Sequence, residues 1–198
     1  EWLQGENACK QGAVKKGIAY YEQGLRRLGN RVPRTRVGFA LGAARELLVQ
    51  GFHTLFPKRL HKKPMSRELA LTSELLVGVS QPYFFSDMLK LGWSHLRGLN
   101  LAEELPPSRQ LAFHYSHHSC FISMTFAWYS RAHRHSERSA ELRRGLNDVW
   151  GTGHTNSYQG LGLYGAARYE DAIEYFLKAI DAFNQAGDMW DLNLARFH

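Results

Sequence analysis

Apolar residues along most of the chain recur at intervals of three and four positions, a spacing typical of helices that bury one face. No stretch shows the alternating Val- and Ile-rich pattern of a strand. The composition, with 44% hydrophobic and 22% charged residues, is that of a folded protein. The pattern predicts an all-α fold with helices at residues 12–28, 34–57, 67–80, 83–105, 109–127, 130–146, 150–165 and 168–186, and with another helix that begins at Trp190.

The chain repeats itself every forty residues. Asp148 recurs as Asp188, and in both places a tryptophan follows two residues later. One step back from Asp148 lies Ser108, and a further step reaches Glu68. Each position has an N-cap type residue or a proline beside it, as helix starts do. Helix pairs too small to fold alone recur in this way because each pair buries its apolar face against its neighbours.

A spacing of small, aromatic and small residues marks the second helix of the best-formed repeat, at Ala172, Phe176 and Ala179. Small side chains allow the preceding helix to approach closely, and the ring fills the remaining space. The pattern predicts a tetratricopeptide-like helical-repeat solenoid of antiparallel helix pairs with a period of about 40 residues.

The predicted organisation is a single helical-repeat domain. Its segments are 1–33, the end of one repeat; 34–65, an inserted apolar helix with basic flanks; 66–107, 108–147 and 148–187, three repeats; and 188–198, the start of the next. Because the chain has no start methionine and begins and ends within repeats, we expect a fragment of a longer array.

The inserted helix from Arg34 to Pro57 interrupts the forty-residue pairing and is too apolar to stand alone in water. We expect it to pack within the array and to bury Leu48, Phe52, Leu55 and Phe56, with its basic ends exposed. In the alternative, its apolar face stays exposed and forms an interface to a missing part of the protein or to another chain.

Positive charge is concentrated in the first third of the chain. Residues 1–67 hold fourteen Lys and Arg against four Asp and Glu, whereas residues 68–198 hold eleven against fourteen. A basic patch consists of Lys58, Arg59, Lys62 and Lys63. Such a cluster suits nucleic-acid phosphates, acidic lipid headgroups or an acidic protein face. Charge runs beside a helix are more often solvated ends, so a solvated or intramolecular role is favoured, with an acidic partner as the alternative.

Candidate catalytic and metal-binding motifs are weak. Gly160 to Gly165 match G-x-G-x-x-G, but they lie within a predicted helix rather than between a strand and a helix. A phosphate-binding G-x-x-x-x-G-K-[ST] sequence is absent. His114 and His118 have the spacing of a zinc-binding pair, yet Tyr115 stands where a catalytic H-E-x-x-H site needs Glu. The chain is therefore predicted to have no catalytic residue, no metal and no cofactor.

The compartment is predicted to be the cytoplasm. Cys9 and Cys120 are too few and too far apart for a disulfide framework, which indicates a reducing environment. The first residues lack the basic and apolar regions of a signal peptide. The uncharged run at 110–130 contains three histidines and four serines and is therefore predicted as a buried or groove-lining helix, so no membrane span is expected.

Three segments resemble a known family: YYEQGLRRLG at 20–29, LRGLNLAE at 96–103 and ERSAELRR at 137–144. They are similar to the helical repeats that follow the ATPase module in large bacterial STAND-type signalling ATPases, which often carry a kinase, cyclase or transcription-regulator domain. The resemblance covers essentially the whole chain. It implies a sensor or scaffold arm whose ATPase and output domains are missing from this fragment.

The function expected from these observations is protein binding in signal transduction, without catalysis in this fragment. The expected partner is a protein segment, or the missing ATPase or output domains of the same chain. One alternative is a small-molecule inducer-binding domain, and a second is a nucleic-acid-binding helical solenoid, which is the least favoured of the three.

The first helices of tetratricopeptide arrays line a concave groove, and aromatic, Met and His side chains on such a wall suit a peptide or a small ligand. The family pattern, extended by the 40-residue step, predicts a groove lined by Glu74, Gln81, Phe84, His114, His117, Phe121, Met124, His154, Ser157, Leu161 and Tyr164.

Overall fold

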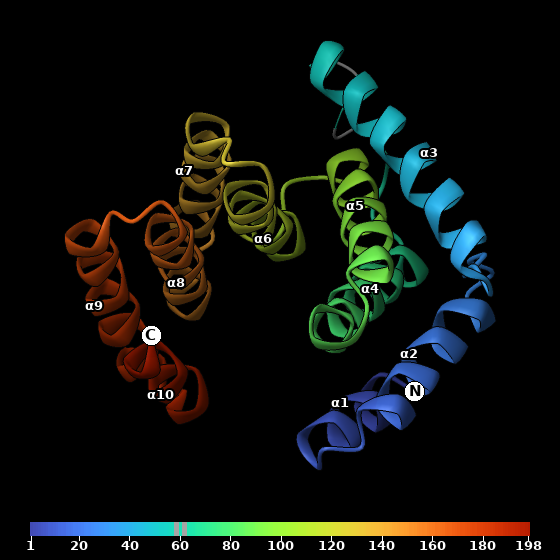
Figure 1. Ribbon diagram of the computed structural model, residues 1–198, viewed down its shortest axis with the longest axis horizontal. Helices are drawn as coiled ribbons and strands as arrows, with labels where there is room; N and C mark the ends of the chain where they lie inside the picture. Colours follow the sequence, from blue (N-terminus) through green and yellow to red (C-terminus); the bar gives the residue numbers. More distant parts are fainter. Residues whose placement is uncertain (58–59, 61–62) are drawn as a thin grey trace. The chain divides into compact units, whose positions relative to one another are not determined.

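The computed structural model describes residues 1–57, 60 and 63–198 (Figure 1). Within these residues the chain has ten helices and no strand, so the predicted all-α helical-repeat fold is confirmed. The helices fall into two compact units, Glu1–Pro106 and Pro107–His198. None of the helices in the described part of the chain combines the length and the apolarity that crossing a membrane requires.

The second unit repeats at a constant step. Its first-type helices begin at residues 109, 149 and 189, and its second-type helices begin at residues 129 and 169. Both series advance by 40 residues, so the predicted period is confirmed. The helices are α6 (Arg109–Phe126), α7 (Tyr129–Gly145), α8 (Val149–Gly165), α9 (Tyr169–Ala186) and α10 (Met189–Phe197).

Side-chain caps and turn residues set this step. Ser108, Asp148 and Asp188 each accept backbone N–H hydrogen bonds from the first turn of the following helix, at 3.0 to 3.2 Å. These N–H groups have no partner within the helix, so the caps stabilise its start. Asn147 and Gly187 end the preceding helices with φ of 49° and 72°, a left-handed conformation that Asn and Gly adopt at low cost.

Phe176 of α9 fills the space between α9 and α8, as the sequence predicts. Ala172 and Ala179 flank it and are buried with it. On the other side, a Cβ added to Gly160 of α8 would lie 3.0 Å from the Phe176 ring, so glycine lets the ring approach α8 more closely than a larger residue would without a shift of the ring. The glycines of the G-x-G-x-x-G sequence lie in α8 and its C-terminal end, and Gly160 serves helix packing.

The first unit consists of α1 (Trp2–Lys10), α2 (Val14–Arg27), α3 (Arg36–Leu55), α4 (Arg67–Ser86) and α5 (Met88–Glu104). The sequence pattern does not predict α1, because a helix of nine residues is marginal on its own and shows little periodicity. Tertiary contact stabilises it: a Cβ added to Gly5 would lie 2.8 Å from the Tyr21 ring of α2. Helix α1 therefore depends on close packing against α2.

Helix α4 extends beyond its predicted end at residue 80. Pro82 lies inside it and is buried, although proline removes one backbone hydrogen bond from a helix interior. Ser86 Oγ donates a hydrogen bond of 2.7 Å to the Pro82 carbonyl, which uses that acceptor within the last turn. The break comes at Asp87, whose carboxylate accepts two backbone N–H groups of α5. The cap, rather than the proline, sets the boundary.

The prediction that α3 buries its large apolar residues is wrong. Leu48 and Leu55 are 77% and 75% exposed, and Phe52 and Phe56 are 42% and 46% exposed. Burying a side chain of this size is worth roughly 1.5–3 kcal/mol, so this face leaves a large favourable contribution unused. Helix α3 does dock on the first unit, but with its other face.

Polar side chains attach α3 to α5. Asn100 Nδ2 donates to the Glu46 carbonyl at 2.8 Å and to the Glu46 Oε2 at 3.0 Å. His53 Nδ1 lies 2.8 Å from Glu103 Oε2, and both side chains are buried. At the N-terminal end of α3, the buried ring of Phe39 packs edge-on against Trp93 at 5.4 Å between centroids. The helix is thus oriented by α5 residues about fifty positions later in the chain.

Candidate functional site

Eight of the eleven predicted groove residues lie on two adjacent helices of the second unit. Helix α6 carries His114, His117, Phe121 and Met124. Helix α8 carries His154, Ser157, Leu161 and Tyr164. The two helices pack side by side. His114 is buried, Met124 and Tyr164 are exposed, and the other five are half-buried. The partly exposed residues form a surface that we name the α6–α8 face.

The remaining three predicted residues lie on α4 in the first unit. Glu74 is half-buried, whereas Gln81 and Phe84 are exposed. Phe84 contacts Phe85 edge-on at 5.1 Å between ring centroids, and Phe85 is 79% exposed. The candidate residues are therefore divided between the two compact units.

An aromatic cluster occupies the N-terminal part of the α6–α8 face. Phe113 is at its centre, with ring centroids 5.9 Å from His117, 5.9 Å from His154 and 6.1 Å from Tyr158. Phe113 and Tyr158 are not among the predicted groove residues. Their signal is helical spacing, because each lies four residues from a predicted histidine and therefore on the same face. Trp150 extends the cluster, at 4.2 Å from His154.

His154 also joins the cluster to α10. Its Nε2 lies 3.0 Å from Asp191 Oδ2, and both side chains are 16% exposed. The same ring contacts Phe183 of α9 edge-on at 5.3 Å. One histidine thus contacts three further helices, so its position depends on the packing of the whole second unit.

Burial keeps the histidines of α6 neutral at neutral pH. Loss of water lowers the pKa of His114 to about 3, and the nearby His117 lowers it further. The pKa of His117 falls to about 4, through burial first and His154 second. Burial raises the pKa of Tyr158 well above its ordinary value. At neutral pH these three side chains are uncharged aromatic groups that can donate or accept hydrogen bonds.

A second pair of histidines lies between α6 and α7. His118 and His135 contact edge-on at 4.8 Å, and Tyr115 lies 5.5 Å from His135. Burial lowers the pKa of His118 well below its ordinary range and that of His135 to about 4. Among the described residues, no three His, Cys, Asp or Glu side chains are placed to hold a metal ion. The structure offers no ligand set for a cofactor metal in this part of the chain.

A small pocket of about 70 Å³ lies among α6, α7 and α8. It is lined by Ser119, Ser123, Tyr129, Ala132, His133, Gln159, Gly162, Leu163 and Arg168, none of which is a predicted groove residue. Ser123 Oγ donates to the Gly162 carbonyl at 3.1 Å across this junction. Pockets that enclose drug-sized ligands measure roughly 300–1,000 Å³, so this one has room for a few water molecules only.

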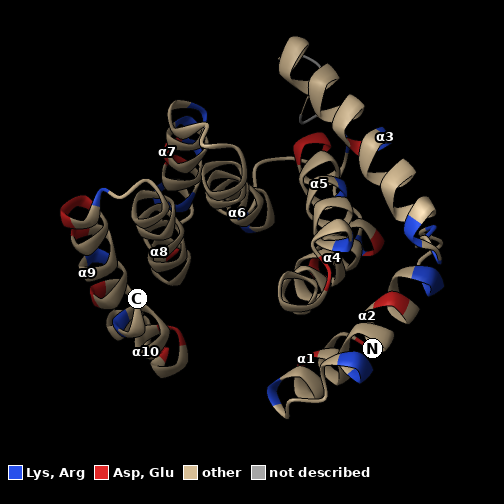
Figure 2. Ribbon diagram, viewed as in Figure 1, with Lys and Arg blue, Asp and Glu red and all other residues tan. Residues whose placement is uncertain are grey.

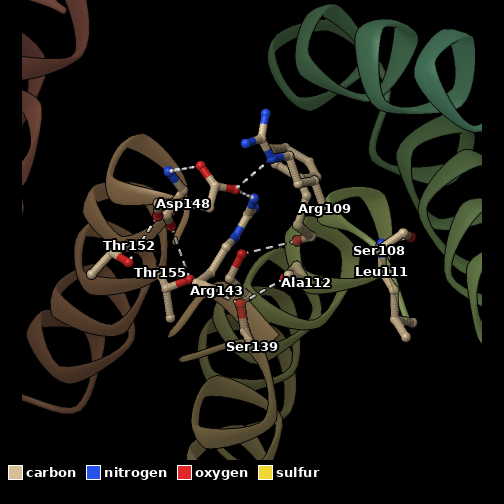
Figure 3. A network of polar contacts seen from close by, with 12 residues as sticks. Ser108, Arg109, Leu111, Ala112, Ser139, Arg143, Asp148, Thr152 and Thr155 are labelled. Atoms are coloured by element: carbon tan, nitrogen blue, oxygen red, sulfur yellow. Dashed lines mark hydrogen bonds and ion pairs between the residues drawn. The ribbon is translucent and has the colours of Figure 1, made fainter. Parts of the chain in front are cut away.

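A buried ion pair connects α6, α7 and α8 (Figure 3). Arg143, which is 1% exposed, forms a close ion pair with Asp148, and Arg109 Nε lies 3.7 Å from the same carboxylate. Burial raises the pKa of Asp148, but the Gly151 N–H and the Arg143 guanidinium lower it more, so the net shift is downward. A Cβ on Gly151 would overlap the Arg143 guanidinium. These contacts are intramolecular and position the helices that carry the α6–α8 face.

The predicted basic patch is only partly described. Lys58, Arg59 and Lys62 lie outside the described residues. Lys63 Nζ lies 2.6 Å from Glu104 Oε2, and the Lys63 N–H donates to the Glu104 carbonyl at 3.0 Å. The one described member of the patch is therefore engaged within the first unit.

No protein-family model, curated protein or solved structure matches this chain.

Proposed function

We propose that this chain is a protein-binding module of an intracellular signalling ATPase and that a segment of the partner lies along the α6–α8 face. The observation that carries the proposal is the row of partly exposed aromatic, Met and His side chains on two adjacent helices. Phe121, Leu161 and Tyr164 belong to this row. Aromatic side chains such as Tyr are frequent binding hot spots because they combine large contact area with few rotatable bonds, and Met adapts its shape to a partner.

The electrostatics of the face favour an apolar or aromatic partner segment over a charged one. His117 and Tyr158 are neutral at neutral pH, and Asp191 is already engaged by His154. The pocket among α6, α7 and α8 measures about 70 Å³, which is too small for a drug-sized inducer. The proposed module therefore binds a peptide along a surface and performs no chemistry on it.

The resemblance of segments such as 20–29 and 137–144 to repeats of bacterial STAND-type ATPases supports a scaffold or sensor role. In this proposal the partner segment belongs to the ATPase or output domains of the same protein or to a signalling partner. The open reading frame that encodes this chain tests the assignment: an ATPase module is expected on the N-terminal side, and its absence would remove the family proposal.

Peptide-display selection against the purified chain tests the binding face. The double variant Met124→Ala with Tyr164→Ala removes two exposed side chains of the face, and about a tenfold or greater loss of affinity is expected for selected peptides. The matched control is Ile173→Ala with Leu177→Ala, which removes two similarly exposed apolar side chains from α9. Equal loss in both variants, or in neither, would contradict the proposed face.

A further inference from the structure

The orientation of α3 is the reverse of that of an ordinary surface helix. Its polar residues Glu46, Gln50 and His53 are buried against the protein. Its large apolar residues are between 42% and 77% exposed, and the two phenylalanines among them also contact each other: Val37, Leu41, Leu47, Leu48, Phe52, Leu55 and Phe56. A surface helix normally buries its apolar side, so an exposed apolar row of this length marks a surface that an apolar medium or partner covers.

The outward face of α3 forms one continuous row. Val37, Leu41, Leu48 and Leu55 follow one another at spacings of four and seven residues, which places them along a single stripe. Helix α3 has 20 residues, which corresponds to a length of about 30 Å. It packs mainly against α5, so the stripe runs along a convex helix rather than in a groove between helices.

Exposed positive charge lies at the N-terminal end of this stripe. Residues 31–55 contain the four cations Arg31, Arg34, Arg36 and Arg45 and a single acidic residue, Glu46, which is buried. At the N-terminal end of α3, Arg31, Arg34 and Arg36 are exposed. In Figure 2 the ribbon of α3 is mostly uncharged, with basic residues gathered at its start. An apolar stripe with exposed cations at its edge is the pattern of a helix that lies in the interface of an anionic bilayer.

We propose that α3 binds the surface of an anionic phospholipid membrane, lying parallel to it with Leu48, Phe52 and Leu55 among the acyl chains. The arginines before the helix then lie at the level of the headgroup phosphates, and the polar side of α3 stays attached to α5. The rest of the chain is held beside the membrane without crossing it. This proposal is independent of the peptide-binding face on α6 and α8.

Two other occupants fit the observations less well. A second copy of this chain would bring two strongly basic segments together, and like charges at an interface oppose association. An acidic partner helix would satisfy the charges, but helices are usually recognised in a groove, and α3 presents a single convex ridge. A bilayer accepts a convex apolar ridge without a complementary groove, so the membrane is the better match.

Vesicle co-sedimentation of the whole chain tests the proposal. The probes are vesicles of phosphatidylcholine alone and of phosphatidylcholine mixed with phosphatidylglycerol. We expect binding to the mixed vesicles, at least about tenfold stronger than to the neutral ones, that weakens as salt is raised. Leu48→Glu with Leu55→Glu is expected to weaken binding by about tenfold or more, because both charges would enter the acyl region.

The matched control is Ile173→Glu with Leu177→Glu, which places the same charges at similarly exposed positions of α9 and should leave vesicle binding unchanged. A Phe52→Trp variant adds a second readout: its fluorescence should shift to shorter wavelength with anionic vesicles and be quenched by brominated acyl chains. Circular dichroism establishes that each variant is folded.

Three results would overturn the proposal. The first is no vesicle binding by a monomeric chain, and the second is equal binding to neutral and anionic vesicles. The third is a dimer that is seen by light scattering and dissociates in the Leu48→Glu variant, while the chain does not bind vesicles. That result would assign the stripe to a second copy of the chain. Loss of vesicle binding in the α3 variant alone, with the α9 variant unaffected, supports the membrane assignment.

Discussion

Helices α9 and α3 have similar lengths but use their apolar residues in opposite ways. Helix α9 has 18 residues and buries Ala172 and Phe176 against α8, and Ala179 in a cluster with Leu192 of α10. Helix α3 has 20 residues and buries Glu46 against α5 while Leu48 stays exposed. The facing helix accounts for the difference: α8 offers glycines that make room for rings, and α5 offers Asn100 and Glu103. Periodicity identifies a helix, but the partner decides which side it buries.

The largest expected effect is on the second unit, which packs around neutral histidines. The pKa of His114 is about 3 and that of His135 about 4 when folded, against about 6.5 in the unfolded chain. The unfolded state therefore binds more protons below pH 6.5, and stability falls as pH decreases through that range. Each of these two histidines should lower the free energy of unfolding by about 2 kcal/mol between pH 7.5 and pH 5.

Thermal melts followed by circular dichroism at these two pH values measure this loss. Hydrogen exchange resolves where it occurs, and amides of α6 and α7 should lose protection before those of α3 and α5. A melting temperature that is the same at pH 5 and at pH 7.5 would show that these histidines are not held neutral by burial.

Phe176→Ala should have an effect of similar size, because truncating a buried Phe costs roughly 3–5 kcal/mol. The Phe176 ring contacts Gly160, which has no side chain. Removing the ring therefore leaves a cavity that this residue of α8 does not fill. Urea denaturation measures the change. The equivalent truncation on α3, Phe52→Ala, removes a half-exposed ring and should cost less than about 1 kcal/mol. Similar losses in the two variants would remove the contrast between α9 and α3.

Asn100→Leu probes the polar attachment of α3. It removes both hydrogen bonds to Glu46 and leaves a buried carboxylate with fewer partners, a change that costs roughly 1–3 kcal/mol. Because α3 is attached mainly through α5, we also expect faster proteolysis within residues 36–55. Limited proteolysis with mass spectrometry locates the cut. Asp87→Ala, which removes the cap of α5, serves as a control that weakens the same unit without touching this contact.

The features that the sequence predicts correctly are local ones. Asp148 and Asp188 cap helices through N–H groups two or three residues away, and Phe176 packs within one helix pair, so short spacings contain the information. The side on which α3 docks depends on Asn100, which lies 54 residues after Glu46. The periodicity of residues within α3 cannot predict a contact with so distant a residue. The prediction of the candidate site omits Phe113 for a related reason. The 40-residue step links groove positions of one repeat to those of the next, and the residue forty positions after Phe113 is Gly153, which is not a groove residue.

Leu48→Ser should have the smallest effect on stability. It tests directly whether α3 exposes its apolar side, because a buried leucine at this position would give a large effect. Leu48 is 77% exposed, so its removal changes little buried area and should alter the free energy of unfolding by no more than about 0.5 kcal/mol. Were Leu48 buried, as its place in the apolar stripe predicts, the same change would cost roughly 2–5 kcal/mol. Urea denaturation separates the two values, with Leu75→Ser of α4, a buried leucine of the same unit, as the reference for a core substitution. A loss at Leu48 that matches the loss at Leu75 would mean that the outward face of α3 is covered in the folded chain.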